Sequence, residues 1–413
     1  MTATTAFVLT HESNPQRVHK STSFIALALT RSLGRKGVSV VRLHPNLLDR
    51  SVTSRYCSGV EICPDFYASE SDLVEFLLKL ETRYPGHRVL IPASDDCAYF
   101  VSRHRDVLQR SFDVVAPPWS VMEKVIDKKR QYEAAAAVGV PIPETYFPAG
   151  IDDVRHLVPQ LDNYPYVIKP IVAHQWRRSV LTKISKGKKG FAVRNAAELL
   201  REYERISAGD PNVMIQEVIG GRDERLFTFL AYFDVQSEPL RYCIRKKIRQ
   251  LPIDFGYCTL TESCYDEKVE EQSIRLLKAL RFQGICGVEW KLDPRTGLYK
   301  LIEINPRAVN TTGIAAACGA DIPFAAFADR TDMPLEPQQG WKSGVKWVCL
   351  TQDLWAARAL RRNGQLSLLD WWRSLRGPMV HAVFAWDDVR PFIGYFLDFL
   401  RMRVRESREK QSA

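Results

Sequence analysis

The fold of this sequence is decided by the stretch Gly287-Val288-Glu289-Trp290-Lys291, which is followed by Leu301-Ile302-Glu303-Ile304-Asn305-Pro306-Arg307. Each stretch places a glutamate between apolar residues, and this pattern favours strands at 287–292 and 298–304. The residues between them, Asp293-Pro294-Arg295-Thr296-Gly297, have the composition of a hairpin turn. We therefore expect a hairpin that brings Glu289 and Glu303 close together.

The side chains of this hairpin indicate a metal site. Glu289, Glu303 and the amide oxygen of Asn305 form an all-oxygen set, which suits Mg²⁺ rather than zinc. Burying two carboxylates without a cation is costly. The alternative is a carboxylate pair that nearby lysines or arginines neutralise, and we favour the metal. Mn²⁺ is the expected substitute for Mg²⁺.

The composition is that of a globular protein. The chain has 413 residues, 46% hydrophobic and 26% charged, and its length predicts two or three domains. No stretch reaches the roughly 18 apolar residues of a membrane-spanning helix. Nine cysteines without a Cys-x-x-Cys pair predict thiols in a reducing cytosol. The net charge of +10 fits an anionic partner such as ATP, a phosphorylated substrate or a membrane surface, and no nucleic-acid fold signature accompanies it.

The first part of the chain alternates strands with helices. Strands are expected at 6–10, 38–43, 89–92 and 112–116, and helices at 23–33 and 73–80. This alternation predicts a parallel sheet, whose ligands lie at the carboxyl ends of the strands. Ser94, Asp95 and Asp96 follow one such end. They fit either the rim of a substrate site or a helix N-cap with acids in its first turn, and the two interpretations are compatible.

The middle of the chain predicts a second region of mixed structure. One helix is expected to start at Trp119, carry Asp127-Lys128-Lys129 and stop at Gly139, because prolines follow. Other expected elements are helices at 197–205 and 270–280 and strands at 166–169, 191–194, 213–218, 226–233 and 240–246, the last two as an antiparallel pair.

Four motifs in this order resemble the ATP-grasp enzymes. They are Asp127-Lys128 at the start of the region, Val167-Ile168-Lys169-Pro170, Ile215-Gln216-Glu217-Val218-Ile219-Gly220-Gly221, and the two acidic stretches at the hairpin. The resemblance covers about residues 119–330. It implies an α/β (in part α+β) protein in which a parallel α/β domain at 1–118 precedes an ATP-grasp domain with two subdomains at 119–335. The composition of the remaining residues, 336–413, predicts a basic, aromatic, helical segment.

The resemblance also implies roles for single residues. Lys128 and Lys169 would bind the phosphates of ATP, with Lys129 as a competitor of Lys128. Main-chain groups near Glu217 and Val218, after Gln216, would bind adenine. The ribose would be held by either Asp223 or Glu224, and the choice between them stays open. Arg307 would face the transferred phosphoryl group or acyl phosphate as a catalytic residue, because a guanidinium can bind a phosphate through two hydrogen bonds. Lys169 would be the second catalytic residue.

Several further residues are candidates for substrate binding. His174, Arg177 and Arg178 belong to a basic aromatic cluster that could bind an anionic acceptor or form a ligand-free cation–π patch. Asn310 and Thr311 follow the metal ligands and could contact substrate or cap a helix that starts near Ile314. The loop 185–190 could cover the triphosphate or be a plain hairpin tip.

The C-terminal segment combines tryptophans with many arginines. Helices are expected at 354–361 and 391–404, and apolar side chains line one face of the second helix. Such a stripe packs either on the protein's own core, which we favour, or on anionic lipid. The expected location is cytoplasmic, with the inner face of the membrane as the alternative.

The motifs together predict a carboxylate–amine ligase that uses ATP and Mg²⁺ and proceeds through an acyl phosphate. Its expected partners are ATP, a small-molecule or sugar-linked carboxylate, an amine, and a second copy of the chain in a homodimer. The alternatives are an ATP-grasp carboxylase or carbamoyl-phosphate-like enzyme, a non-catalytic ATP sensor, and a peripheral membrane module.

Overall fold

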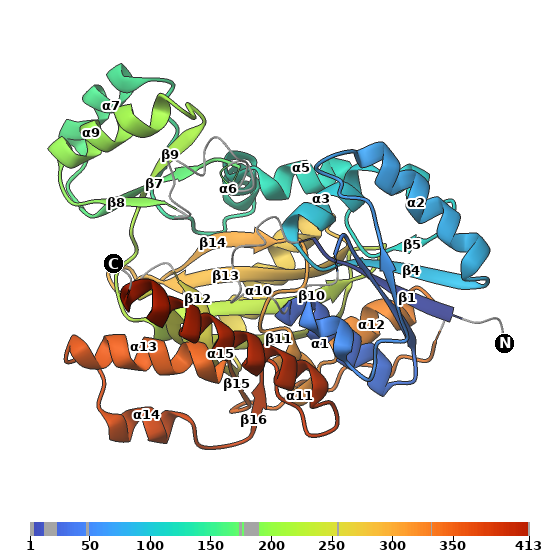
Figure 1. The fold of residues 1–413 in the computed structure, drawn as a ribbon. Helices are drawn as coiled ribbons and strands as arrows, with labels where there is room; N and C mark the ends of the chain where they lie inside the picture. Colours follow the sequence, from blue (N-terminus) through green and yellow to red (C-terminus); the bar gives the residue numbers. More distant parts are fainter. Residues whose placement is uncertain are drawn as a thin grey trace.

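A computed structural model describes residues 4–11, 23–46, 49–172, 176, 190–253, 256–331 and 333–411, with side chains as far as Arg401. The described strands form three sheets of five, seven and four strands. Figure 1 shows the seven-stranded sheet in the middle of the molecule, the five-stranded sheet on one side of it, and the four-stranded sheet in a lobe that projects from the top.

The five-stranded sheet is parallel, as the sequence predicts, and its order is β3-β2-β1-β4-β5. Its strands are β1 (Thr4–Leu9), β2 (Ser39–His44), β3 (Gly59–Ile62), β4 (His87–Pro92) and β5 (Asp113–Val114), and its helices are α1 (Phe24–Arg35), α2 (Glu70–Arg83), α3 (Asp95–Arg103) and α4 (Arg105–Leu108). Strand β3 was not predicted, because its four residues are partly or fully exposed and carry no apolar run.

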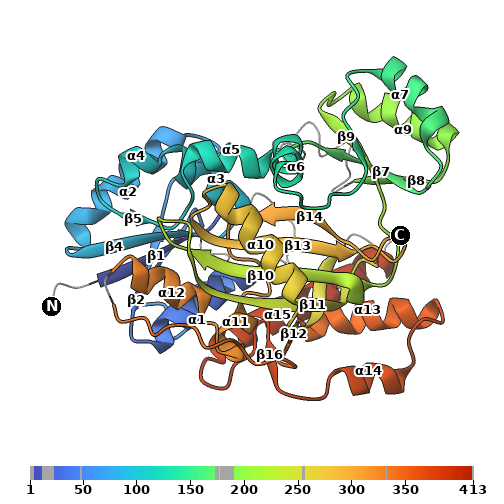
Figure 2. The same ribbon diagram turned by 180° about the vertical axis from the view of Figure 1, so that it is seen from behind.

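The central sheet has the order β14-β13-β10-β11-β12-β15-β16. Its strands are β10 (Leu226–Phe233), β11 (Pro239–Leu251), β12 (Tyr257–Cys264), β13 (Gly284–Leu292), β14 (Tyr299–Asn305), β15 (Lys346–Val348) and β16 (Met379–His381). Helix α10 (Glu267–Ala279) packs on it, as Figure 2 shows from behind. The predicted hairpin is confirmed, with Glu289 opposite Glu303 in the antiparallel register.

The four-stranded sheet forms the projecting lobe. It consists of β6 (Thr145–Tyr146), β7 (Tyr166–Pro170), β8 (Phe191–Val193) and β9 (Val213–Glu217), in the order β6-β9-β7-β8, with helices α7 (Ile151–Leu157) and α9 (Ala196–Ser207). The lobe has a small apolar core of its own. The buried side chain of Trp176 belongs to this core and donates a hydrogen bond to Asp210 (2.7 Å).

The prediction of a single helix from Trp119 to Gly139 is wrong, because two helices meet at Asp127. Helix α5 (Trp119–Ile126) ends there and α6 (Lys128–Ala137) begins. Asp127 has extended backbone angles, and its carboxylate accepts a hydrogen bond from the N–H of Arg130 (3.0 Å) as an N-cap. Lys128 therefore stands in the first turn of α6, where its N–H donates to the carbonyl of Ile171 at the end of β7 (3.0 Å).

The C-terminal segment adds strands β15 and β16 to the central sheet. Its helices are α13 (Leu350–Arg362), α14 (Leu368–Ser374) and α15 (Arg390–Gln411). The preceding helices α11 (Gly313–Cys318) and α12 (Ile322–Asp329) share one apolar core with α1 and β15. The predicted domain limits at 118/119 and 335/336 stay predictions.

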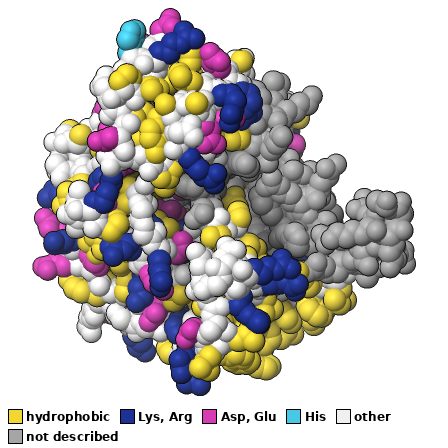
Figure 3. All heavy atoms as spheres, turned by 90° about the vertical axis from the view of Figure 1, so that its left-hand side faces the viewer, with side chains coloured by type: hydrophobic (Ala, Val, Ile, Leu, Met, Phe, Trp, Pro, Cys, Tyr) yellow, Lys and Arg dark blue, Asp and Glu magenta, His cyan; other side chains and the backbone are white. Residues whose placement is uncertain are grey.

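One face of α15 packs on the rest of the protein. Tyr395 is buried in the core, and Asp398 pairs with Arg50 (2.6 Å), so this face fits the expected packing on the protein's own core. The other face leaves Ile393, Phe396, Leu397 and Leu400 exposed. Figure 3 shows hydrophobic side chains gathered at the lower right of one side of the molecule, beside lysines and arginines. None of the described helices has the length and apolar character needed to cross a membrane.

Candidate active site

The acidic residues of the β13–β14 hairpin form the centre of the site. Glu289 and Glu303 are cross-strand partners, and Asn305 pairs with Gly287 two residues along the strands, on the same face of the sheet. The amide nitrogen of Asn305 donates to Glu303 Oε1 (3.3 Å). Within the described part of the chain, the half-buried carboxylate of Glu289 has no hydrogen-bond or ion-pair partner.

This donor set fits Mg²⁺. The described residues contain no group of three or more His, Cys, Asp or Glu side chains that could hold a metal ion. Two carboxylates and one amide oxygen are nevertheless enough, since Mg²⁺ keeps few protein ligands and takes the others from phosphates and water. A half-buried carboxylate without a partner, as at Glu289, is the side chain that a cation would stabilise.

Lys128 lies against the hairpin. Its ammonium group is 3.3 Å from Glu303 Oε2 and 3.4 Å from the carbonyl oxygen of Ile302, and the residue is 9% exposed. Lys129 is exposed, with its ammonium group 5.8 Å from the ring centre of Phe147. The geometry favours Lys128 over Lys129 as the residue beside the hairpin carboxylates.

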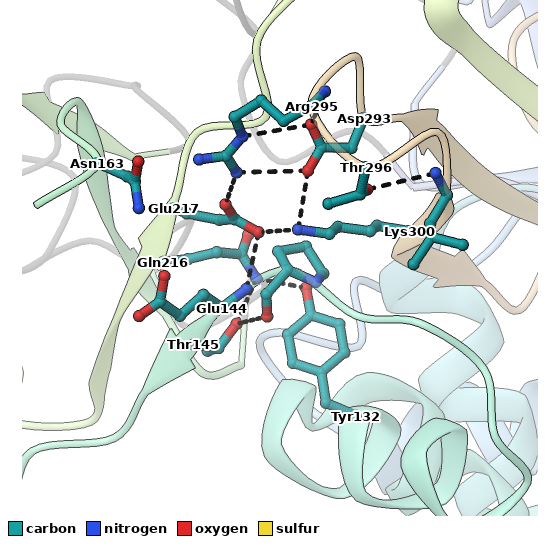
Figure 4. A network of polar contacts seen from close by, with 12 residues as sticks. Tyr132, Glu144, Thr145, Asn163, Gln216, Glu217, Asp293, Arg295, Thr296 and Lys300 are labelled. Atoms are coloured by element: carbon teal, nitrogen blue, oxygen red, sulfur yellow. Dashed lines mark hydrogen bonds and ion pairs between the residues drawn. The ribbon is translucent and has the colours of Figure 1, made fainter. Parts of the chain in front are cut away.

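Lys169 joins the same region through Gln216. The ammonium group of Lys169 donates to Gln216 Oε1 (3.0 Å). The amide nitrogen of this buried glutamine donates to the hydroxyl groups of Tyr132 and Thr145, each at 2.9 Å, as Figure 4 shows. Tyr132, one turn after Lys128 on α6, in turn donates to the carbonyl of Ile302 (2.9 Å). The predicted residues Lys128, Lys169, Gln216 and Glu303 are thus brought together.

Glu217 has a structural role that the sequence did not reveal. Its buried carboxylate accepts hydrogen bonds from Lys300, Arg295 and the N–H of Glu144, as drawn in Figure 4. Burial opposes ionisation, but the hydrogen bonds, that from Lys300 first, outweigh it and lower the pKa of Glu217. This carboxylate therefore ties strand β9 of the lobe to the β13–β14 hairpin of the central sheet.

Two of the main-chain groups in the region proposed to bind adenine already form hydrogen bonds within the protein. The N–H of Glu217 donates to the carbonyl of Glu144 (2.9 Å), and the N–H of Val218 donates to that of Pro165 (3.1 Å). The expectation that main-chain groups here bind adenine is therefore restricted to the carbonyl oxygens of these residues.

Asp293 anchors the other end of this network. Its side chain lies 3.0 Å from the ammonium group of Lys300 and accepts from the N–H of Arg295 (2.9 Å). Burial opposes ionisation here too, yet the hydrogen bonds from Arg295 and Lys300 prevail and lower the pKa of Asp293 to about 2. The turn is therefore fixed relative to both the lobe and the sheet.

The two candidate ribose ligands differ in their surroundings. Asp223 lies in a short 3-10 turn (Asp223–Arg225) and accepts a hydrogen bond from Gln250 (2.7 Å), while Glu224 is exposed. The preceding loop is fixed by Lys291, whose ammonium group donates to the carbonyls of Gly221 (3.1 Å) and Arg222 (3.0 Å). An oriented carboxylate suits recognition of hydroxyl groups better than an exposed one, which favours Asp223.

Arg307 connects the hairpin to the first domain. Its guanidinium donates to Asp95 Oδ1 (2.6 Å) and to the side-chain oxygen of Asn305 (3.3 Å). Ser94 is the N-cap of α3, and Asp95 and Asp96 stand in its first turn, so the capping interpretation is confirmed. The Asp95–Arg307 pair places this strand end beside the metal-type residues, which the rim interpretation requires.

The remaining substrate candidates have different outcomes. Asn310 and Thr311 follow the hairpin, and none of the residues that the structure describes forms a hydrogen bond with the hydroxyl of the buried Thr311. The proposed capping by this segment is not observed, because Thr312 at the N-cap position of α11 makes no capping hydrogen bond; its hydroxyl instead accepts a hydrogen bond from the N–H of Val309 (2.8 Å). His174, Arg177 and Arg178, and all of the loop 185–190 except Gly190, lie outside the described residues.

Comparison with known proteins identifies the family. A family model described as "Carbamoyl-phosphate synthase L chain, ATP binding domain" matches residues 257–330. The chain is 26% identical over 297 residues to D-aspartate ligase of Enterococcus faecium, covering 68% of this chain and 69% of that protein. It is 27% identical over 227 residues to a probable alpha-L-glutamate ligase of Stenotrophomonas maltophilia, covering 54% and 72%. The chain is an ATP-grasp ligase.

Solved structures agree with this fold. A biotin carboxylase from Campylobacter jejuni in complex with an ATP analogue has a TM-score of 0.61 at 17% identity, covering 83% of this chain and 74% of that one. A biotin carboxylase domain dimer from Hydrogenobacter thermophilus, in complex with MgADP, ADP and bicarbonate, has a TM-score of 0.60 at 16% identity, covering 82% and 71%. The ATP-grasp ligase described here binds ATP and joins a carboxylate to an amine, forming a carbon–nitrogen bond.

Proposed function

We propose that this ligase activates the carboxylate of an amino acid as an acyl phosphate and transfers the acyl group to an amine. One observation carries the proposal: Glu289, Glu303, Asn305 and Arg307 lie together on or next to one hairpin, and Lys128 of α6 contacts this hairpin at Glu303. The relatives named for D-aspartate and L-glutamate ligation support an amino acid rather than a sugar acid as the carboxylate substrate.

The reaction needs no covalent bond to the enzyme. A carboxylate oxygen attacks the γ-phosphorus of ATP, the bond to the bridging oxygen breaks, and ADP leaves. The amine nitrogen then attacks the acyl carbon, phosphate leaves with the bonding electron pair, and the amine loses a proton. Positioning and electrostatics carry most of the catalysis in such phosphoryl transfer.

The residues of the site divide these tasks. Glu289, Glu303 and Asn305 would hold Mg²⁺, which supplies charge neutralisation at the phosphates when bound. Lys128 and Lys169 would offset the remaining phosphate charge, and Arg307, oriented by Asp95, would bind the transferred phosphoryl group. Mn²⁺ would replace Mg²⁺, since it accepts the same oxygen ligands. The adenine and ribose would lie near Glu217, Val218 and Asp223.

The test is phosphate release from ATP and Mg²⁺ over a panel of amino acids and amines. The proposal expects release only when an acid and an amine are both present, with mass spectrometry showing the amide. A Glu303→Gln variant should lose release by about 100-fold or more, because it removes one charged ligand of the metal. ATP binding without product from any pair would contradict ligation and favour a nucleotide sensor.

Two interactions beyond the active site are part of the proposal. A homodimer would follow the dimer named for the Hydrogenobacter domain and is tested by analytical ultracentrifugation. Contact with an anionic membrane surface would use the exposed side chains of α15, such as Phe396 and Leu400. Sedimentation with anionic vesicles tests it, and recovery of all the protein in the supernatant would exclude it.

A further inference from the structure

Strand β11 carries three buried cations, of which two have no acidic partner in the part of the chain that the structure describes. Arg249 is paired with Asp353 through two hydrogen bonds of 2.9 and 2.8 Å. Arg245 and Lys247 are 3% and 7% exposed, and no carboxylate of the described residues pairs with either.

The hydrogen-bond partners of these two cations among the described residues are all neutral. Arg245 contacts the sulfur of Cys258 (3.6 Å) and the hydroxyl of Thr261 (3.3 Å), and its Nε has no hydrogen-bond partner among the described residues. Lys247 donates to the side-chain oxygen of Gln250 (3.1 Å) and keeps two further N–H groups. A buried charge without a counter-charge is strongly unfavourable in a protein interior, so its presence indicates that an anion binds there.

The sheet register places these cations beside the active site. Thr228 on β10 is the cross-strand partner of Glu289 on one side and of Arg245 on the other. Direct partners share a face of the sheet, so Glu303, Glu289 and Arg245 lie in one row, and Lys247 follows two residues along the same face. Two strand spacings, roughly 10 Å, separate the backbones at Glu289 and Arg245.

The thiol of Cys258 lies within electrostatic reach of Arg245, Lys247 and Glu289. Burial raises the pKa of this thiol, Arg245 and Lys247 act to lower it, and Glu289 and then Asp353, the partner of Arg249, act to raise it further. The two unpaired cations and the metal-type carboxylate therefore influence one position.

We propose that Arg245 and Lys247 bind a second, non-reacting carboxylate of the acid substrate, so that the enzyme selects a dicarboxylic amino acid. This inference rests on the proposed function. The reacting carboxylate would lie at the row of Glu289 and Glu303, and the second one would be held across β10. The triphosphate is the other anion that the cations could contact, but in the proposed function Lys128 on α6 and Lys169 on β7 would already bind it.

The experiment compares aspartate with alanine and 3-aminopropanoate, each of which lacks one of its two carboxylates. The wild type should prefer aspartate, or glutamate in the matching set, by about 100-fold in kcat/KM. Arg245→Met and Lys247→Met should each lower kcat/KM for the diacid by about 10- to 100-fold, mainly through KM, and leave the monoacids within about threefold. Lys246→Met is the matched control, because this lysine lies on the opposite face near Glu262 (3.9 Å) and should leave the preference unchanged.

Two further measurements separate the inference from its rivals. Calorimetry of diacid binding, with a non-hydrolysable ATP analogue present, tests the subsite even if no ligation occurs. A weaker Kd for the analogue itself in the two variants would assign the cations to the triphosphate and overturn the inference. The melting temperature of Arg245→Met should stay within a few degrees of the wild type, whereas Arg249→Met should melt much earlier. A large loss at Arg245 with unchanged diacid binding would show a purely structural role.

Discussion

At the residue scale, Lys128 and Lys129 are adjacent in sequence but differ in burial and partners. Lys128 is buried beside Glu303, while Lys129 is exposed. We expect Lys128→Met to weaken ATP binding by about 10- to 100-fold, the usual effect of losing a charged hydrogen bond. Lys129→Met should change the Kd by no more than about threefold. Titration calorimetry with ATP and Mg²⁺ measures both, and equal effects would contradict the assignment.

The lowered pKa of Asp293 predicts acid sensitivity. As the pH falls, this carboxylate is protonated first in the unfolded chain, near its usual value of 3.8, and only near pH 2 in the folded protein. Its contribution, about 2 kcal/mol, is therefore present above pH 4 and is lost as the pH falls towards 2. Urea unfolding at pH 5, 4, 3 and 2 should show this loss in the wild type. In Asp293→Asn the slope over this window should be smaller, and an unchanged slope would refute the prediction.

At the scale of elements, the break at Asp127 positions Lys128. We expect Asp127→Ala to cost about 1 kcal/mol of unfolding free energy, as N-cap losses usually do, and to weaken ATP binding by displacing the start of α6. Asn195 caps α9 in the same way but lies away from the hairpin carboxylates, so Asn195→Ala should cost similar stability and leave ATP binding unchanged. Denaturation and calorimetry on both variants make the comparison.

The hairpin was predictable from sequence because its period and turn are local. Strand β12 was missed, since its buried residues include the polar Thr259, Thr261 and Ser263, which find hydrogen-bond partners only in the folded protein. Strands β15 and β16 have three residues each, too few for a period. The structural role of Glu217 and the buried cations of β11 were not predicted either. Their surroundings come from segments that are distant in the sequence, and spacing does not encode them.

At the scale of the whole molecule, the C-terminal segment closes onto the first domain. The buried carboxylate of Asp388 accepts hydrogen bonds from Arg31 (2.9 Å), the hydroxyl of Ser54 (2.6 Å) and the N–H of Arg55 (2.9 Å). Arg31 also donates to the carbonyl of Val383 (2.7 Å). Because β15 and β16 extend the central sheet, this contact links the first helix, the sheet and the last helix in one structure.

This closure predicts a contrast between two adjacent aspartates. Asp388→Ala leaves the Arg31 guanidinium buried without its counter-charge, so we expect a loss of about 3–5 kcal/mol of unfolding free energy. Asp387 pairs with Arg35 at the surface (2.8 Å), where both side chains are more than 40% exposed, and Asp387→Ala should cost less than about 1 kcal/mol. Chemical denaturation followed by tryptophan fluorescence measures both losses. Similar losses in the two variants would mean that the buried pair does not hold the C-terminal segment to the first domain, and that packing of α15 through Tyr395 does so instead.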